Sequence, residues 1–85
     1  MNKTIIDVRM PEEYALGHAK NSMNIPLQEL NDHMEELKKI HGEIVVCCAS
    51  GMRSAKAYRI LQQNGFDKIS NGGSWIDVEG MIAHL

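Results

Sequence analysis

Near the middle of the chain lies the segment Cys48-Ala49-Ser50-Gly51-Met52-Arg53-Ser54, from which the arrangement of its neighbours can be predicted. An apolar run, Ile44 to Cys47, precedes it, and an amphipathic run, Ser54 to Asn64, follows it. This order predicts a buried strand, a tight loop and a helix. The first N–H groups of a helix lack intrahelical partners, and the helix dipole favours negative charge beside them. We therefore expect Cys48 to lose its proton more readily than a free cysteine does, and to react as a thiolate.

The part of the chain before this stretch predicts one strand and two helices. Residues 4–8 are apolar and partly β-branched, which indicates a short buried strand. Pro11 and the two glutamates after it favour a short helix that stops near Gly17. Residues 22–26 should be extended, because Pro26 disfavours helix for the residue before it. An amphipathic helix closed by Gly42 is then predicted from apolar residues at helical spacing: Leu27, Leu30, Met34, Leu37 and Ile40.

The part after the stretch continues the same alternation. The helix over residues 54–64 should bury Ala57, Tyr58, Ile60 and Leu61 and expose Lys56, Arg59, Gln62 and Gln63. We expect a third short strand at residues 68–70, a tight turn at Gly72-Gly73 and a last short helix over residues 76–84. This alternation predicts an α/β fold with a mainly parallel central sheet and helices on both faces. Ligands of such sheets bind beyond the carboxyl ends of the strands, where Cys48 falls.

Length, charge and cysteine content exclude several classes of protein. The 85 residues predict a single domain, residues 1–85, which we expect to be a monomer. A net charge of −2 without a basic cluster argues against a nucleic-acid partner. The absence of a long apolar run or a signal peptide predicts no membrane partner and a cytoplasmic location, unless a leader was removed. Cys47 and Cys48 are adjacent and poorly placed to pair with each other, and the histidines are too scattered to predict a metal site.

Four segments resemble, in the expected order, motifs of the single-domain rhodanese sulfurtransferases. Cys-x-Ser-Gly-x-Arg-Ser after Val-Val resembles the active-site loop of that family. The other segments are Ile6-Asp7-Val8-Arg9 with Glu12-Glu13-Tyr14, Gly17-His18-Ala19 through Asn24-Ile25-Pro26-Leu27, and Gly65-Phe66 with Gly72-Gly73-Ser74-Trp75. The resemblance covers residues 4–75. The chain departs from the family at its N-terminus, where the first strand begins almost at Met1, so we expect a sheet truncated at that edge.

The resemblance implies sulfur transfer through a persulfide of Cys48. The Cys48 thiolate would attack the outer sulfur of a donor such as thiosulfate and release sulfite. The persulfide would then pass its sulfur to cyanide, a thiol or a protein acceptor. Loop N–H groups would stabilise the anion, and a two-step transfer of this kind predicts ping-pong kinetics. No metal and no cofactor other than the transient persulfide is expected.

For the remaining residues of the loop, the sequence leaves more than one role open. Arg53 is either a clamp for the anionic end of the donor or a brace bonded to backbone carbonyls. Ser50 and Ser54 can donate hydrogen bonds, although Ser54 also suits a helix cap. Met52 is expected at the pocket mouth, or else on the surface without consequence. Small residues at Ala49 and Gly51 let the backbone curl around the sulfur.

Residues outside the loop are interpreted mainly as structural. The resemblance implies that Asp7 and Arg9 brace the loop. Cys47 is expected in the core, with a resolving role as the alternative. His18 should satisfy a backbone group, and Trp75 should fill the core beneath the loop.

Two other functions remain open. A cysteine phosphatase or arsenate reductase uses a similar loop, but with one residue more between Cys and Arg than the four between Cys48 and Arg53. The shorter loop suits a sulfur atom better than a tetrahedral oxyanion. A persulfide relay, sulfur carrier or partner-binding module needs the same loop as a thiosulfate enzyme, and the sequence does not separate them.

Overall fold

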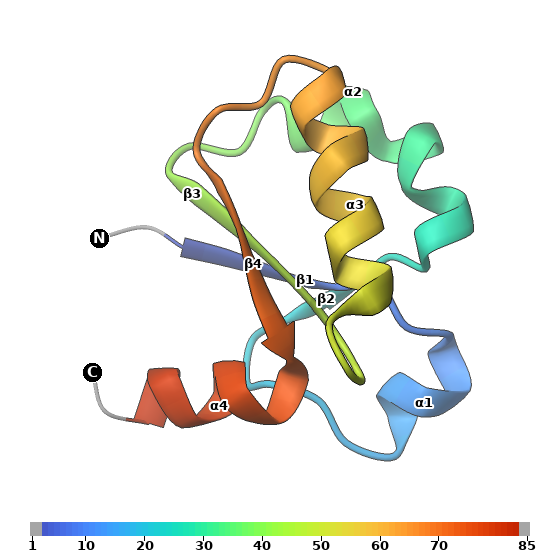
Figure 1. The fold of residues 1–85 in the computed structure, drawn as a ribbon, viewed down its shortest axis with the longest axis vertical. Helices are drawn as coiled ribbons and strands as arrows, with labels where there is room; N and C mark the ends of the chain where they lie inside the picture. The colour runs from blue at the N-terminus through green and yellow to red at the C-terminus, as the bar shows by residue number, and fades with distance from the viewer. Residues whose placement is uncertain (1–2, 84–85) are drawn as a thin grey trace.

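The computed structural model describes residues 3–83, with the side chains of residues 3–81, and its centre is a parallel sheet (Figure 1). Four strands lie in the order β2-β1-β3-β4, and all three pairings are parallel. The strands are β1 (Lys3–Asp7), β2 (Met23–Asn24), β3 (Glu43–Cys48) and β4 (Ile69–Ser74). The helices are α1 (Pro11–Ala15), the 3-10 helix η1 (Leu27–His33), α2 (Met34–Leu37), α3 (Met52–Gln63) and α4 (Trp75–Ala83). The predicted α/β fold with a parallel sheet is confirmed.

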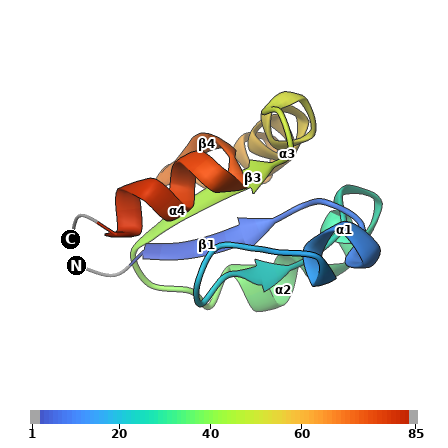
Figure 2. The same cartoon turned by 90° about the horizontal axis from the view of Figure 1, so that it is seen from below.

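Apolar side chains cover both faces of the sheet, as the unbroken apolar run in β3 predicted. Figure 2 shows α2 and α4 on opposite sides of the strands. One core lies under η1, α2 and α3 and contains Val46 and Cys48. The other lies under α4 and contains Val45 and Cys47. Side chains alternate along a strand, so the two cysteines enter different cores and point apart.

The prediction of one amphipathic α-helix from Leu27, closed by Gly42, is wrong: the segment is mostly a 3-10 helix, and it is interrupted. The segment forms the 3-10 helix η1 and then the single turn α2, divided at His33, whose φ of −110° and ψ of 10° are not helical. Three of the four apolar steps, Leu27 to Leu30, Met34 to Leu37 and Leu37 to Ile40, are three residues, which matches the three residues per turn of a 3-10 helix. The apolar stripe itself was predicted correctly, because Leu30 and Leu37 are fully buried.

The Gly72-Gly73 pair lies inside β4 and is not the turn that was predicted. Val46 pairs with Asn71 and Cys47 with Gly73, so Gly72 is the extra residue of a bulge. A Cβ atom on Gly72 would lie 2.5 Å from Val78 Cγ2, so this position has no room for a side chain. The bulge therefore lets α4 approach the sheet closely.

Other boundaries shift by a few residues. The predicted extended connection at residues 22–26 contains the two-residue strand β2, which pairs with β1. Helix α3 begins at Met52, two residues earlier than predicted, so Arg53 belongs to its first turn. Its buried side is narrower than predicted: Ala57 and Leu61 are buried, whereas Tyr58 and Ile60 are only partly so. Helix α4 ends at Ala83, and the predicted end at His84 lies outside the described residues.

Candidate active site

Cys48 is the last residue of β3, and the loop after it ends at the start of α3. In the view of Figure 1 the tip of this loop points downward between α1 and α4. Gly51 precedes α3 with a φ of 98°, a left-handed conformation that glycine adopts without strain. The turn folds the backbone back over the sulfur, and Cys48 is 0% exposed. The predicted order of strand, tight loop and helix is confirmed.

Three groups at the start of α3 contact the Cys48 sulfur. The backbone N–H of Gly51 donates to Sγ at 3.0 Å and that of Ser54 at 3.4 Å, and the Ser54 Oγ lies 3.5 Å away. Burial on its own raises the pKa of the Cys48 thiol. Hydrogen bonds from the Ser54 hydroxyl and from the N–H groups of Ser54, Gly51 and Ser50 outweigh burial and hold that pKa below its ordinary value. The site therefore favours a thiolate, the nucleophilic form of cysteine.

Cys47 has the opposite environment. It is 0% exposed and packs in the other core, against α4. Burial, followed by the negative charge of Asp7, raises the pKa of its thiol to about 12. Cys47 therefore stays protonated near neutral pH, as expected of a core residue.

Arg53 forms a bidentate ion pair with Glu13 of α1. The Nη1–Oε1 distance is 2.6 Å and the Nη2–Oε2 distance is 2.9 Å. Neither of the two roles predicted for Arg53 included this partner. The side chain braces the site, as one alternative proposed, but through a carboxylate rather than through backbone carbonyls. The guanidinium lowers the pKa of Glu13 to about 2, with a smaller contribution from the N–H of Met10.

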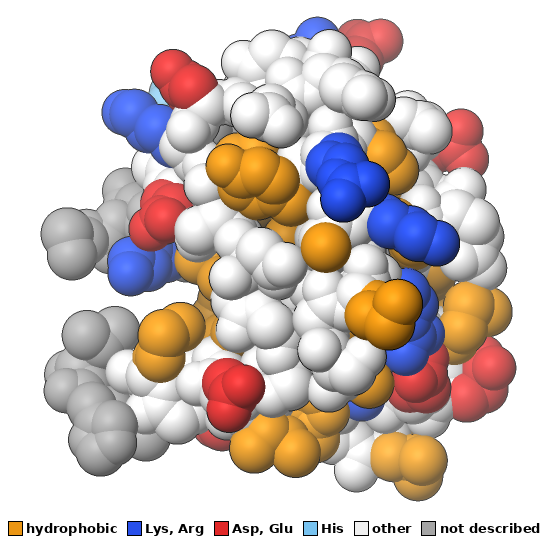
Figure 3. Space-filling view, viewed as in Figure 1, with side chains coloured by type: hydrophobic (Ala, Val, Ile, Leu, Met, Phe, Trp, Pro, Cys, Tyr) orange, Lys and Arg blue, Asp and Glu red, His pale blue; other side chains and the backbone are white. Residues whose placement is uncertain are grey.

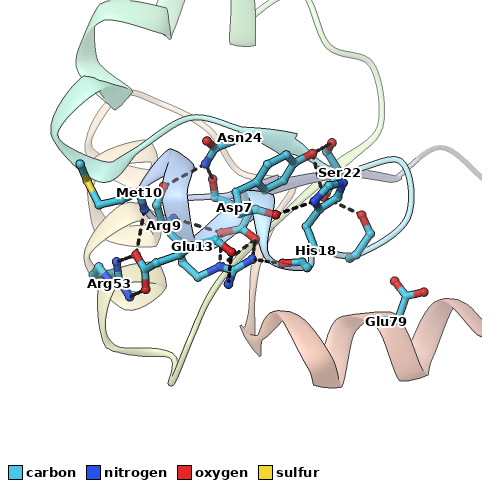
Figure 4. A network of polar contacts seen from close by, with 12 residues as sticks. Asp7, Arg9, Met10, Glu13, His18, Ser22, Asn24, Arg53 and Glu79 are labelled. Atoms are coloured by element: carbon cyan, nitrogen blue, oxygen red, sulfur yellow. Dashed lines mark hydrogen bonds and ion pairs between the residues drawn. The ribbon is translucent and has the colours of Figure 1, made fainter.

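Asp7 and Arg9 hold the segment that carries Glu13 (Figure 4). The Arg9 guanidinium donates to both Asp7 carboxylate oxygens at 2.7 to 3.0 Å, and both side chains are almost fully buried. Arg9 Nη2 also donates to the Gly17 carbonyl at 2.7 Å, and Nη1 to that of Glu13 at 3.3 Å. The side-chain amide of Asn24 donates to the carbonyls of Asp7 and Arg9. The Asp7–Arg9 pair does not contact Arg53, but it holds the backbone at Glu13 of α1 and at Gly17 after it, and so positions the carboxylate that pairs with Arg53.

The other residues singled out in the sequence lie around this centre. Ala49 and Ser50 are exposed at the loop tip, and Met52 is 74% exposed. His18 Nδ1 lies 2.8 Å from the Tyr14 carbonyl, and its ring stacks on that of Tyr14, in agreement with the predicted backbone contact. Trp75 packs over the core that contains Cys47. The Cζ atom of Arg9 lies over the Trp75 ring, 5.1 Å from its centroid. It therefore supports the Asp7–Arg9 side of the site.

The surface around the site is mixed in character. Figure 3 shows separate hydrophobic groups on the face seen in Figure 1, with Lys and Arg side chains beside them. Large apolar side chains are exposed near the loop and on the elements that flank it: Leu16, Met52 and Ile76. On the outer side of α3, Lys56 and Arg59 are exposed, as predicted.

Two residues with direct contacts to the loop were missed from the sequence, Glu13 and Asn71. Glu13 had been considered as an acidic residue at a helix start and as part of a family motif, but not as a partner of the loop. Asn71 accepts a hydrogen bond from the Ser54 hydroxyl at 2.7 Å. No spacing rule connects either residue to the loop, because their partners lie 40 and 17 positions away in the chain.

The described residues contain no group of three or more His, Cys, Asp or Glu side chains that could hold a metal ion. Among the helices that the structure describes, none has the length and apolar character needed to cross a membrane.

The parallel sheet, with Cys48 at the end of a central strand and the start of α3 over its sulfur, defines an α/β protein with a cysteine-centred loop. Residues 1–74 match the family described as Rhodanese-like domain, and the chain belongs to this family of rhodanese-like sulfurtransferases. The recognition made from the four sequence motifs is confirmed.

Three known proteins illustrate this relationship. The thiosulfate sulfurtransferase PspE of Escherichia coli is 34% identical over 74 residues, which cover 86% of this chain and 71% of that protein. The putative sulfur carrier protein YrkF of Bacillus subtilis is 40% identical over 67 residues, or 79% of this chain, and the match spans only 36% of the relative. A rhodanese from E. coli solved with anions superimposes with a TM-score of 0.81 at 31% identity, covering 89% of this chain and 91% of that one.

Proposed function

We propose that this protein transfers sulfane sulfur from a donor such as thiosulfate to a thiophilic acceptor through a persulfide on Cys48. The thiolate attacks the outer sulfur of thiosulfate, a new S–S bond forms, and sulfite leaves with the electron pair of the broken bond. Cyanide or a thiolate then attacks the outer persulfide sulfur and takes it, and the Cys48 thiolate is regenerated. Neither step needs an oxidant, a reductant, a metal or a cofactor.

The observation that carries this proposal is the set of donors around Cys48 Sγ. The N–H groups of Gly51 and Ser54, at 3.0 and 3.4 Å, stabilise an anionic sulfur inside a site that is closed to solvent. These donors stabilise the thiolate that attacks the sulfur donor and that is regenerated when the acceptor takes the sulfur. Ser50 and Met52 are exposed on the same loop, and they are the residues that we expect to meet the acceptor.

The proposal is tested by the intact mass of the protein after incubation with thiosulfate. We expect a gain of one sulfur atom that cyanide removes as thiocyanate. Cys48→Ser should gain no sulfur and keep the circular dichroism spectrum of the wild type, whereas the matched control Cys47→Ala should still be loaded. Sulfur loading of Cys48→Ser would overturn the assignment of the nucleophile.

A persulfide relay is the second candidate, and the Glu13–Arg53 ion pair favours it. The charge of the Arg53 guanidinium is already offset by the Glu13 carboxylate, so it attracts the dianionic thiosulfate less strongly than an unpaired guanidinium would. The match to the putative sulfur carrier protein of B. subtilis agrees with such a role. A relay would accept sulfur from a persulfide donor faster than from thiosulfate and release it slowly to cyanide. Comparing the two donors in the same mass assay separates the candidates.

We also propose a cytoplasmic location. Both cysteines are free and buried, and Cys48 must remain reduced to act as a nucleophile. Fractionation of cells that produce the natural protein tests this point.

A further inference from the structure

Asn71 is connected to the reactive sulfur through one side chain, that of Ser54. Asn71 Oδ1 lies 2.7 Å from Ser54 Oγ, which lies 3.5 Å from Cys48 Sγ. Ser54 is fully buried in the first turn of α3, whereas Asn71 lies in β4, which pairs with β3. The contact therefore joins the reactive cysteine to a strand outside the active-site loop.

The bulge in β4 fixes the orientation of the Asn71 amide. The backbone N–H of Gly73 donates to Asn71 Oδ1 at 3.0 Å, and only the oxygen of the amide can accept this bond. The atom facing Ser54 is therefore also the amide oxygen. Because a carbonyl oxygen cannot donate, the Ser54 hydroxyl must be the donor in the 2.7 Å contact.

A serine hydroxyl has a single proton, and three acceptors compete for it here. These are Asn71 Oδ1 at 2.7 Å, the Gly51 carbonyl at 3.1 Å and the ionised Cys48 sulfur at 3.5 Å. When Cys48 is a thiol, its S–H donates to Ser54 Oγ while Ser54 donates to Asn71. When Cys48 is a thiolate, the hydroxyl stabilises it only if the proton turns away from Asn71.

We propose that Asn71 is a positioning residue that sets the acidity of Cys48 by competing with the thiolate for the Ser54 proton. This inference rests on the proposed function, because it concerns the same nucleophile, but its measurement needs no sulfur transfer. Loss of the Asn71 acceptor leaves only the Gly51 carbonyl, at 3.1 Å, to compete with the thiolate for the Ser54 proton, and so lowers the pKa of Cys48. A carboxylate at position 71 holds the proton more firmly, adds negative charge and raises that pKa.

The other charged groups around Cys48 belong to α3, α1, α4 and the segment that carries Asp7 and Arg9. Arg53 of α3 faces the thiolate and is paired with Glu13 of α1. Asp7 and Arg9 lie on the side of Cys47, and Asp77 of α4 lies close to Gly73. None of these groups contacts the Asn71 side chain through a hydrogen bond in the described part of the structure. Substitution of Asn71 therefore changes the Ser54 contact and leaves these charges in place.

The test is the rate of Cys48 alkylation by iodoacetamide as a function of pH, with the modified residue located by fragment-ion mass spectrometry. We expect Asn71→Ala to move the midpoint down by about half a pH unit, or about threefold more thiolate below the midpoint. Asn71→Asp, which is nearly isosteric and keeps the acceptor for Gly73, should move it up. The matched control is Asn64→Ala, because the side-chain amide of Asn64 donates to the Ile60 carbonyl at the far end of α3 and should leave the profile unchanged.

The decisive comparison repeats Asn71→Ala in a Ser54→Ala background. If Asn71 acts through the hydroxyl, its substitution has no further effect once the hydroxyl is gone. A downward shift that persists without Ser54, or an unchanged or upward profile for Asn71→Ala, overturns the proposal. If Asn71→Ala does not fold, Asn71→Asp decides, and the absence of an upward shift counts against the proposal. A protein that shows these shifts but accepts no sulfur would contradict the proposed function alone.

Discussion

Arg53 and Glu13 join the first turn of α3 to α1 by two parallel N–H···O bonds of 2.6 and 2.9 Å (Figure 4). Glu13 Oε1 also accepts a hydrogen bond from the N–H of Met10 at 2.9 Å and so caps the N-terminus of α1. The planar guanidinium fits a carboxylate in this two-pronged geometry, which lysine cannot reproduce. One carboxylate thus connects the loop that holds Cys48 to the segment anchored by the buried Asp7–Arg9 pair.

Replacement of Glu13 should weaken the fold modestly. Arg53 and Glu13 are each about one third exposed, at 36% and 37%, so solvent screens their interaction. We expect Glu13→Gln to lower the free energy of unfolding by about 0.5–1 kcal/mol, measured by urea denaturation at pH 7. Glu12→Gln, at the neighbouring position without an ion pair among the described contacts, is the control. Equal effects of the two substitutions would show that the ion pair contributes nothing.

The Glu13–Arg53 ion pair should also make the free energy of unfolding depend on pH. The pKa of Glu13 falls from its ordinary value of 4.5 to about 2 in the folded protein because Arg53 donates to it. A carboxyl with a lowered folded pKa stabilises the fold fully above its unfolded pKa and loses this contribution as pH falls through the folded value. The stability difference between wild type and Glu13→Gln should therefore be constant above about pH 5 and shrink between pH 4.5 and 2. A difference that does not change over this range would contradict the assignment.

The Ser54 hydroxyl should contribute measurably to the acidity of Cys48. Its oxygen lies 3.5 Å from Cys48 Sγ, and together with the N–H groups of Ser54 and Gly51 it lowers the pKa of Cys48. Ser54→Ala keeps both N–H donors and removes only the hydroxyl, so the alkylation midpoint of Cys48 should rise by about half to one pH unit. Ser50→Ala, in the exposed loop tip, should leave the midpoint where it is. If the alkylation midpoint of Cys48 does not change in Ser54→Ala, the thiolate is stabilised by the backbone N–H groups alone.

Asp7 should matter far more to stability than an exposed carboxylate does. It is fully buried and bonded to Arg9, which is only 5% exposed, so Asp7→Ala leaves a buried guanidinium without its counter-charge. We expect a loss of about 3–5 kcal/mol, seen as a large drop in the urea midpoint. Glu43→Gln breaks the exposed pair with Lys3 and should cost less than about 1 kcal/mol. If the two variants lose similar amounts of unfolding free energy, the buried Asp7–Arg9 pair would be no more important to stability than the exposed Lys3–Glu43 pair.

The sequence predicted those features that depend on neighbours in the chain. The strand before Cys48, the helix after it and the opposite faces of Cys47 and Cys48 follow from apolar patterning and strand alternation. The Glu13–Arg53 and Ser54–Asn71 contacts join segments that meet only after the sheet has formed, so no local pattern contains them. The long helix from Leu27 was predicted wrongly because a spacing of three residues fits both helix types over a short distance.

The clearest steric prediction concerns Gly72, the bulge residue of β4 that was taken for part of a turn. A Cβ atom there would lie 2.5 Å from Val78 Cγ2 and 2.9 Å from Val45 Cγ1, closer than such contacts ever come. Gly72→Ala must therefore push α4 away from the sheet and should cost about 1–3 kcal/mol in thermal or urea unfolding.

Gly80 provides the matched control for this substitution. It lies within α4, and apart from the backbone of its own helix and its chain neighbours no described atom would be within 4 Å of its added Cβ. Gly80→Ala should raise the free energy of unfolding by about 0.5–1 kcal/mol, because alanine favours helix over glycine. Opposite signs for two Gly→Ala changes that lie eight residues apart would show that β4 needs glycine at position 72 for the close approach of α4. A neutral Gly72→Ala would instead mean that α4 shifts freely and that the bulge does not fix the position of Val78.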